Sequence, residues 1–216
     1  PRLRPKYAVL DPELTVGLPP HITSTTGMDA LTHAVEAYIG QSNTKDTEAA
    51  ALKATKLIFA NLEEAYKNGK DLEARANMLE GSYLAGIAFT RAYVGYVHAI
   101  AHNLGGMYGI PHGLANSVIL PVVLEEYGST IYPRLAKLAE IVGINGQTEE
   151  ELAKGFIAEI KAMNERMAIP TAFEQIKEED IPTIVERAMK EAHPLYPTPV
   201  IFDADRLAQI VRKLKG

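Results

Sequence analysis

Hydrophobic residues recur three or four positions apart along most of this chain. Within residues 27–39 the large apolar side chains fall at Met28, Leu31, Val35 and Tyr38, and this spacing places them on one face of a helix. The same periodicity continues downstream and predicts helices over residues 27–39, 46–66, 71–92, 97–104, 114–127, 133–142, 149–167, 177–190 and 203–214. The pattern therefore predicts an all-α, multi-helix fold.

Prolines, glycines and hydroxyl residues mark the expected helix ends. The run Leu-Pro-Pro at residues 18–20 is expected to break the chain, and the hydroxyls at residues 23–26 to cap the first helix. Gly105 and Gly106 are expected to end the fourth helix, and Thr148 to cap the seventh. We find no internal repeat and no low-complexity segment.

The beginning of the chain has a different pattern. Residues 7–10, Tyr-Ala-Val-Leu, form a short apolar run between prolines, which is compatible with one strand. Since the rest is predicted to be helical, such a strand needs a sheet supplied by a missing domain or a partner. We therefore divide the chain into an extended leading segment, residues 1–15, and an all-helical domain, residues 16–216.

Composition excludes several classes of protein. Hydrophobic residues make up 47% and charged residues 23% of the 216 residues, which is typical of globular proteins and not of disordered or fibrous ones. The formal charge of −5 gives no attraction to nucleic acid or anionic membranes. The absence of cysteine excludes thiolate metal sites and fits a reducing compartment. No apolar run approaches the roughly 18–20 residues that span a bilayer, so we expect a cytoplasmic protein without nucleic-acid or membrane partners.

Histidines are concentrated where they could bind a metal ion. His98, His102 and His112 fall within one short stretch, and Asp29 precedes His33 by four positions, as His98 precedes His102. Residues four apart share one face of a helix. A carboxylate and imidazoles are typical ligands of Zn²⁺ and Fe²⁺.

Spacing alone leaves a metal site and a helical bundle with structural histidines as open alternatives. An Asp–His pair one turn apart is commonly a surface pair, but both segments here are apolar, and buried charged groups need a partner or a metal. The motif HExxH is absent, which disfavours a metalloprotease, and no phosphate-binding loop or GxSxG is present. His21 and His193 lie beside prolines, and we interpret them as structural or exposed.

Three motifs, in this order, carry a resemblance to a known family. TGMDALTHAVEAY, AFTRAYVGYVHAIAHNLGG and GIPHGLANSVILP, preceded by DPELTVGLPP, resemble the C-terminal helical domain of the iron-containing (group III) alcohol dehydrogenases. The resemblance covers essentially the whole chain. It implies a multi-helix domain like those of the dehydroquinate synthase-like and iron-containing alcohol dehydrogenases.

The resemblance implies a role for each of five residues. Matched motif by motif, Asp29, His33, His98 and His112 correspond to the family's metal ligands. His102 matches a further histidine near the nicotinamide and the substrate, to which we assign substrate contact or proton handling. The metal is expected to be Fe²⁺ or Zn²⁺, acting as a Lewis acid on an alcohol or aldehyde while NAD or NADP carries the hydride.

The family's nucleotide-binding domain has no counterpart in this sequence. The resemblance therefore implies that NAD or NADP is held mainly by an absent N-terminal domain, a partner of this one, and that the isolated chain lacks dehydrogenase activity. The resemblance is also compatible with homo-oligomerisation. Asn103 and Asn116 are candidates for fixing the orientation of the ligand histidines.

Two alternative functions are also compatible with the sequence. The first is an enzyme of the related glycerol dehydrogenase or dehydroquinate synthase branches, which share this architecture and usually use Zn²⁺. The residues of the motifs GMDALTHAVEAY and GIPHGLAN favour the alcohol dehydrogenase branch. The other alternative is a metal-binding or interaction domain without catalysis, whose exposed surface binds another protein.

Overall fold

The structure, a computed structural model, describes residues 7–216. This part contains nine α-helices, three short 3₁₀-helices and no strand, which confirms the all-α prediction. The α-helices are α1 (Pro20–Ile39), α2 (Lys45–Lys67), α3 (Leu72–Ala92), α4 (Tyr96–Tyr108), α5 (His112–Tyr127), α6 (Tyr132–Ile141), α7 (Glu149–Arg166), α8 (Ile181–Ala192) and α9 (Ala204–Lys213). The 3₁₀-helices are η1 (Pro12–Thr15), η2 (Gly128–Ile131) and η3 (Glu178–Asp180).

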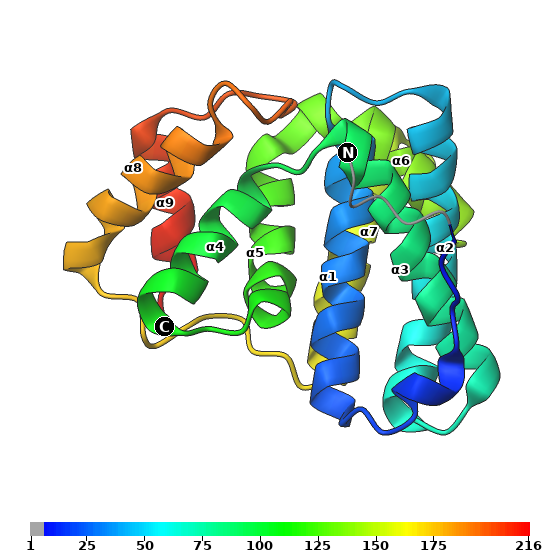
Figure 1. The fold of residues 1–216 in the computed structure, drawn as a ribbon. Coiled ribbons are helices and arrows are strands. Elements are labelled where there is room, and N and C mark those ends of the chain that lie inside the picture. Colours follow the sequence, from blue (N-terminus) through cyan, green and yellow to red (C-terminus); the bar gives the residue numbers. More distant parts are fainter. Residues whose placement is uncertain (1–6) are drawn as a thin grey trace.

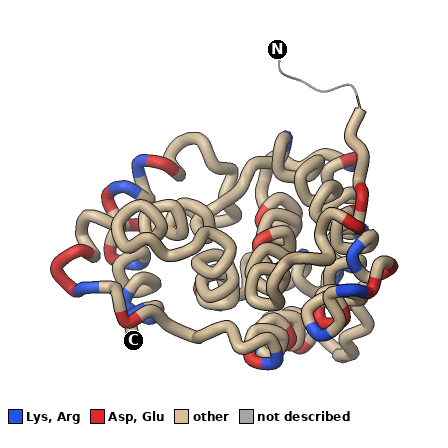
Figure 2. The backbone as a smooth tube through the Cα atoms, turned by 60° about the horizontal axis from the view of Figure 1, so that its bottom comes forward, with Lys and Arg blue, Asp and Glu red and all other residues tan. Residues whose placement is uncertain are grey.

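Helix α1 runs through the middle of the molecule and separates two groups of helices (Figure 1). On one side it packs against α2 and α3, and on the other against α5, which contacts α4 and α7. Helices α8 and α9 pack on each other and cover the far side of α4 and α5. Acidic and basic residues are interspersed along the backbone (Figure 2). None of the helices in the described part is long and apolar enough to cross a membrane.

The start of α1 differs from the sequence prediction. The helix begins at Pro20, ahead of the expected caps, with Pro19 as its N-cap. Proline is tolerated in the first turn because the amide groups there have no helical partner. The hydroxyl of Thr25 consequently donates back to the carbonyl of His21 at 2.8 Å instead of capping the helix. His21 therefore lies in the first turn of α1, exposed, and not in a loop.

Two further helix ends differ in a way that matters for the histidines. Helix α4 continues through Gly105 and Gly106 and ends only before Gly109, whose φ of +68° stops the helix. Glycine inside a helix costs about 1 kcal/mol, which the burial of α4 outweighs. Helix α5 starts at His112, directly after Pro111. His112 thus belongs to the first turn of a helix and not to the preceding loop.

The start of α7 agrees with the sequence prediction, whereas the start of α8 does not. Thr148 caps α7 by accepting a hydrogen bond from the backbone N–H of Glu151 at 3.1 Å. The predicted helix over 177–190 begins later, at Ile181, following η3.

The leading segment has little regular structure. Residues 7–10 are exposed and form no strand within the described residues; because the expected strand needs a sheet from another domain or a partner, it stays a prediction. Residues 12–15 form η1, which Asp11 caps by accepting from the N–H of Glu13 at 3.0 Å. The part of the predicted segment formed by residues 1–6 lies outside the described residues.

Candidate metal centre

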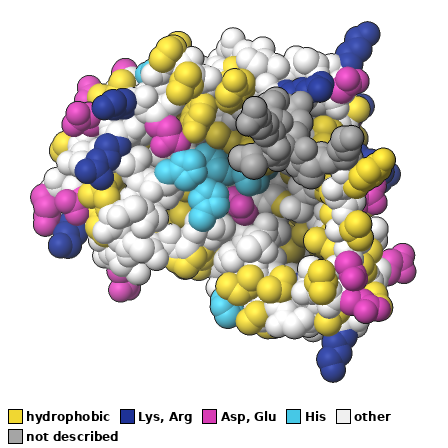
Figure 3. Space-filling model, viewed as in Figure 1, with side chains coloured by type: hydrophobic (Ala, Val, Ile, Leu, Met, Phe, Trp, Pro, Cys, Tyr) yellow, Lys and Arg dark blue, Asp and Glu magenta, His cyan; other side chains and the backbone are white. Residues whose placement is uncertain are grey.

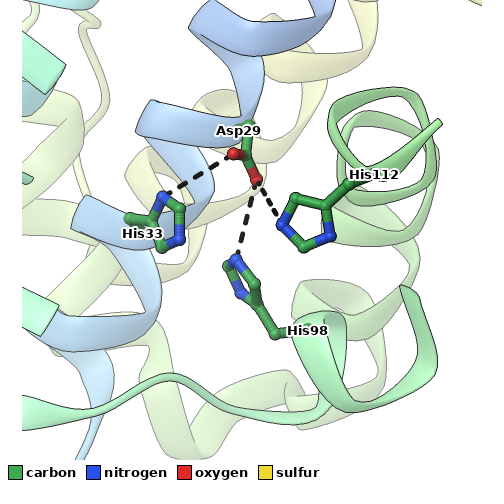
Figure 4. A group of neighbouring side chains, drawn as sticks. All are labelled: Asp29, His33, His98 and His112. Atoms are coloured by element: carbon green, nitrogen blue, oxygen red, sulfur yellow. Dashed lines mark ion pairs between the residues drawn. The ribbon is translucent and has the colours of Figure 1, made fainter. Parts of the chain in front are cut away.

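Four side chains named in the sequence analysis meet where α1, α4 and α5 come together (Figure 4). Asp29 and His33 project from successive turns of α1, His98 comes from α4, and His112 from the first turn of α5. One possible ligand atom from each lies within 4.8 Å of all the others. Asp29 Oδ1 lies 3.6 Å from His98 Nε2 and 3.4 Å from His112 Nε2, and Asp29 Oδ2 lies 3.9 Å from His33 Nδ1.

A glycine allows α5 to approach α1 closely enough for this convergence. A Cβ atom on Gly113 would lie 2.6 Å from the carbonyl oxygen of Thr25 in α1, well inside van der Waals contact. The obstacle is backbone, which cannot rotate away as a side chain can. Gly113 thus sets the distance between the helices that carry Asp29 and His112.

Ring stacking holds the histidines in place. His33 stacks on Phe89 of α3 with ring centroids 4.3 Å apart, and on His98 with centroids 4.4 Å apart. His98 is buried, whereas His112 is exposed to solvent. Figure 3 shows one patch of histidines at the centre of this face, beside acidic side chains. The cluster is therefore fixed on its inner side and accessible from outside.

Glu36, which the sequence analysis did not single out, orients His98. This carboxylate is 4% exposed, accepts the N–H of Val97 at 2.9 Å, and lies 2.6 Å from His98 Nδ1. Nδ1–H therefore donates to Glu36, and Nε2 faces the cluster. Glu36 lies two turns after Asp29 on α1. An acidic residue at that spacing in an apolar helix is the signal that could have identified it.

Asn116, one of the two candidate orienting residues, contacts two members of the cluster. Its Nδ2 donates to Asp29 Oδ1 at 2.5 Å and lies 3.0 Å from His112 Nε2. The other candidate, Asn103, donates to the carbonyl of Ala99 on its own helix.

Burial and neighbouring charges shift the pKa values of the cluster. Burial lowers the pKa of His33 to about 4, so this ring is neutral near pH 7. Burial alone would raise the pKa of Asp29, but the neighbouring imidazoles of His112, His98 and His33 outweigh it and hold this pKa well below the usual range. For His98, burial favours the neutral ring, yet the carboxylates of Asp29 and Glu36 raise its pKa to about 9.

His102 lies beside the cluster. Its ring stacks almost parallel to that of His112, with centroids 5.2 Å apart, and meets His98 edge-on at 5.9 Å. Its Nδ1 lies 2.7 Å from Glu191 Oε1. His193 is hydrogen-bonded to the hydroxyl of Tyr96, in agreement with a structural role.

The residues present fit a divalent metal ion. His98 Nε2 is buried and has no hydrogen-bond partner, which is costly for a polar atom unless a ligand satisfies it. One carboxylate and three imidazoles are a donor set that suits Fe²⁺ and Zn²⁺. The glutamate behind His98 is the kind of outer partner that metal-binding histidines have.

One carboxylate and three imidazoles that converge in an all-helical domain are an arrangement that could hold a metal ion. The sequence profile described as "Fe-containing alcohol dehydrogenase family, C-terminal" matches residues 23–214. The chain therefore belongs to the iron-containing alcohol dehydrogenase family, of which it represents the C-terminal part.

Individual relatives agree with this assignment. The chain is 41% identical to alcohol dehydrogenase 4 of Saccharomyces cerevisiae over 213 residues, which cover 97% of this chain and 54% of that protein. It is 44% identical to 1,3-propanediol dehydrogenase of Klebsiella pneumoniae over 194 residues, 88% of this chain and 50% of the relative. A crystal structure of 1,3-propanediol oxidoreductase superposes with a TM-score of 0.90 at 41% identity, over 94% of this chain and 54% of that one. The chain thus spans about half the length of these relatives.

Proposed function

We propose that this chain is the metal-binding catalytic part of an alcohol dehydrogenase that interconverts alcohols and aldehydes with NAD or NADP. The observation that carries the proposal is the convergence of Asp29, His33, His98 and His112 on one point. Membership of the family supports the same reaction class.

Relatives suggest the kind of substrate and coenzyme. The yeast and Klebsiella relatives are named for alcohols in general and for 1,3-propanediol. We therefore propose that the substrates are small alcohols and their aldehydes. Other relatives are named an NAD-dependent methanol dehydrogenase and an NADPH-dependent butanol dehydrogenase, and the proposal therefore includes both coenzymes.

We assign the metal-binding function to residues 16–216 and the coenzyme to a separate domain. The relatives are about twice as long as the matched region, which supports a nucleotide-binding half as partner of this one. Residues 1–15 would then lead from that half into the helices. Hydride transfer needs donor and acceptor in near contact, so we expect the isolated chain to be inactive.

Asp29, His33, His98 and His112 are the residues that would hold the metal, Fe²⁺ or Zn²⁺. When bound, the metal supplies a Lewis acid for the alcohol oxygen and the nicotinamide supplies the hydride acceptor.

The remaining residues of the site have separate tasks. Glu36 accepts from His98 Nδ1 and so keeps Nε2 directed at the cluster. Asn116 holds the carboxylate of Asp29 by donating to it. To His102 we assign the uptake of the hydroxyl proton and its release to water; its exposure and its stack on His112 support this role.

A chimera tests this proposal. The chain is joined to the N-terminal half of the Klebsiella pneumoniae 1,3-propanediol dehydrogenase, loaded with Fe²⁺ or Zn²⁺, and assayed with NAD⁺ and NADP⁺ on small alcohols and glycerol. We expect metal-dependent oxidation of small alcohols, abolished by His112→Ala and retained by His21→Ala, which alters an exposed histidine outside the cluster. A folded, metal-loaded chimera without turnover would contradict the proposal, and preference for glycerol with Zn²⁺ would favour the glycerol dehydrogenase alternative.

A further inference from the structure

His102 shares a hydrogen-bonded group with two residues from a distant part of the chain. Glu191 lies near the end of α8, which packs against α4 (Figure 1). Its Oε1 lies 2.7 Å from His102 Nδ1, and the hydroxyl of Tyr196, in the loop after α8, donates to the same oxygen at 2.7 Å. His102 and Glu191 are 89 positions apart in the sequence, and no sequence pattern connects them.

The shared oxygen determines where the protons lie. An ionised carboxylate only accepts hydrogen bonds, so both neighbours must donate to it. Burial, together with the adjacent Glu191, raises the pKa of Tyr196, which therefore keeps its proton. His102 correspondingly carries its hydrogen on Nδ1. Nε2 is then the ring nitrogen that retains a lone pair.

Two restraints fix the same ring next to the proposed metal ligands. The hydrogen bond to Glu191 holds one edge of His102, while the stack on His112, with an interplanar angle of 15°, holds its face. The side chain of His102 is nevertheless 45% exposed. The ring therefore lies at the solvent-exposed edge of the cluster in a defined orientation.

We propose that Glu191 is a positioning residue that holds His102 in the Nδ1–H tautomer, so that Nε2 accepts the hydroxyl proton of an alcohol bound at the cluster. Tyr196 donates to the Glu191 carboxylate and so restrains it. That the substrate is an alcohol rests on the proposed function. In the proton step the alcohol O–H bond breaks and an N–H bond forms at Nε2, while the C–H electron pair leaves as the hydride that the nicotinamide accepts. The imidazolium formed lies beside the Glu191 carboxylate and then releases its proton to water.

Nitrogen NMR of the histidine rings tests the proposal directly. The chain is labelled with ¹⁵N-histidine and measured at a pH well above the raised pKa of His98, with and without Zn²⁺, and His102→Gln identifies the resonances. We expect a protonated Nδ1 and an unprotonated Nε2 for His102. Glu191→Gln, which keeps a carbonyl acceptor, should retain this tautomer. Glu191→Ala should reverse it to Nε2–H, the form that free imidazole side chains prefer.

A matched control separates positioning from the loss of any surface ion pair. Glu80→Ala breaks the exposed pair with Lys53, and it should leave the His102 spectrum unchanged. An Nε2–H tautomer in the parent chain, or an unchanged tautomer in folded Glu191→Ala, would overturn the proposal. Because the readout needs neither turnover nor bound metal, failure of the dehydrogenase proposal and failure of this one are distinguishable.

Discussion

Glu36 Oε2 lies 2.6 Å from His98 Nδ1, and both side chains are almost completely buried. The two residues come from different helices, α1 and α4, so this contact couples the packing of the fold to the direction of a proposed ligand nitrogen. Removing the negative charge while preserving the shape isolates that coupling.

We expect Glu36→Gln to weaken metal binding by about 10–100-fold, the usual effect of losing an outer partner of a metal-binding histidine. The chain should stay folded because Gln can still accept the Val97 N–H. Competition with a chromophoric chelator measures the affinity, and Glu125→Gln, on the exposed surface, is the control. Equal affinity of Glu36→Gln and the parent chain would show that Glu36 does not support the site.

Gly113→Ala should also weaken metal binding, by about tenfold or more. The added Cβ would meet the Thr25 carbonyl at 2.6 Å and push α5 away from α1, separating His112 from Asp29. Gly106→Ala is the matched control, since a Cβ there has nothing within 4 Å. Chelator competition together with circular dichroism distinguishes a displaced ligand from general unfolding. Indistinguishable affinities for the two variants would contradict the role of Gly113.

Metal uptake should depend on pH through His98. Without metal its pKa is raised to about 9, so near neutral pH the metal must displace a proton, whereas His33, with a pKa lowered to about 4, carries none to displace. The apparent affinity should therefore rise with pH, by about tenfold per unit between pH 7 and 9, and level off above. Titration in buffers of different pH measures this slope, and a flat profile would contradict it.

The sequence predicted the helices well because caps and apolar spacing are local signals. It misplaced the ends of α1, α4 and α5 because proline in a first turn and glycine inside a buried helix are tolerated when tertiary packing outweighs a cost of about 1 kcal/mol. Gly105 and Gly106 show this most clearly, since α4 continues through both.

The four-residue cluster could be proposed from motifs, but its supporting contacts could not. Glu36 and Glu191 reach their histidines only through the packing of α1 on α4 and of α4 on α8. Of the two asparagines considered, only the fold shows that Asn116 contacts Asp29 while Asn103 bonds within its own helix.

A buried amide compensates for a proline within α5. Pro121 has no N–H to offer the carbonyl of Ser117, one turn earlier, and Asn164 Nδ2 from α7 donates to that carbonyl at 2.7 Å. Asn164→Ala should cost about 1–3 kcal/mol of unfolding free energy, because the carbonyl would be buried without a partner. In a Pro121→Ala background, where the N–H is restored, the loss should shrink by about 1 kcal/mol or more. Urea unfolding measures both, and equal losses in the two backgrounds would exclude this compensation.

Metal content tests the central claim most directly. The chain is purified anaerobically, incubated with Fe²⁺ or Zn²⁺, desalted and analysed for metal, beside His98→Ala and the exposed-residue control His21→Ala. We predict near-stoichiometric metal in the parent and in His21→Ala, and its loss in folded His98→Ala. A folded parent chain that retains neither metal, or a His98→Ala variant that binds as much as the parent, would contradict the assignment of Asp29, His33, His98 and His112 as a metal site.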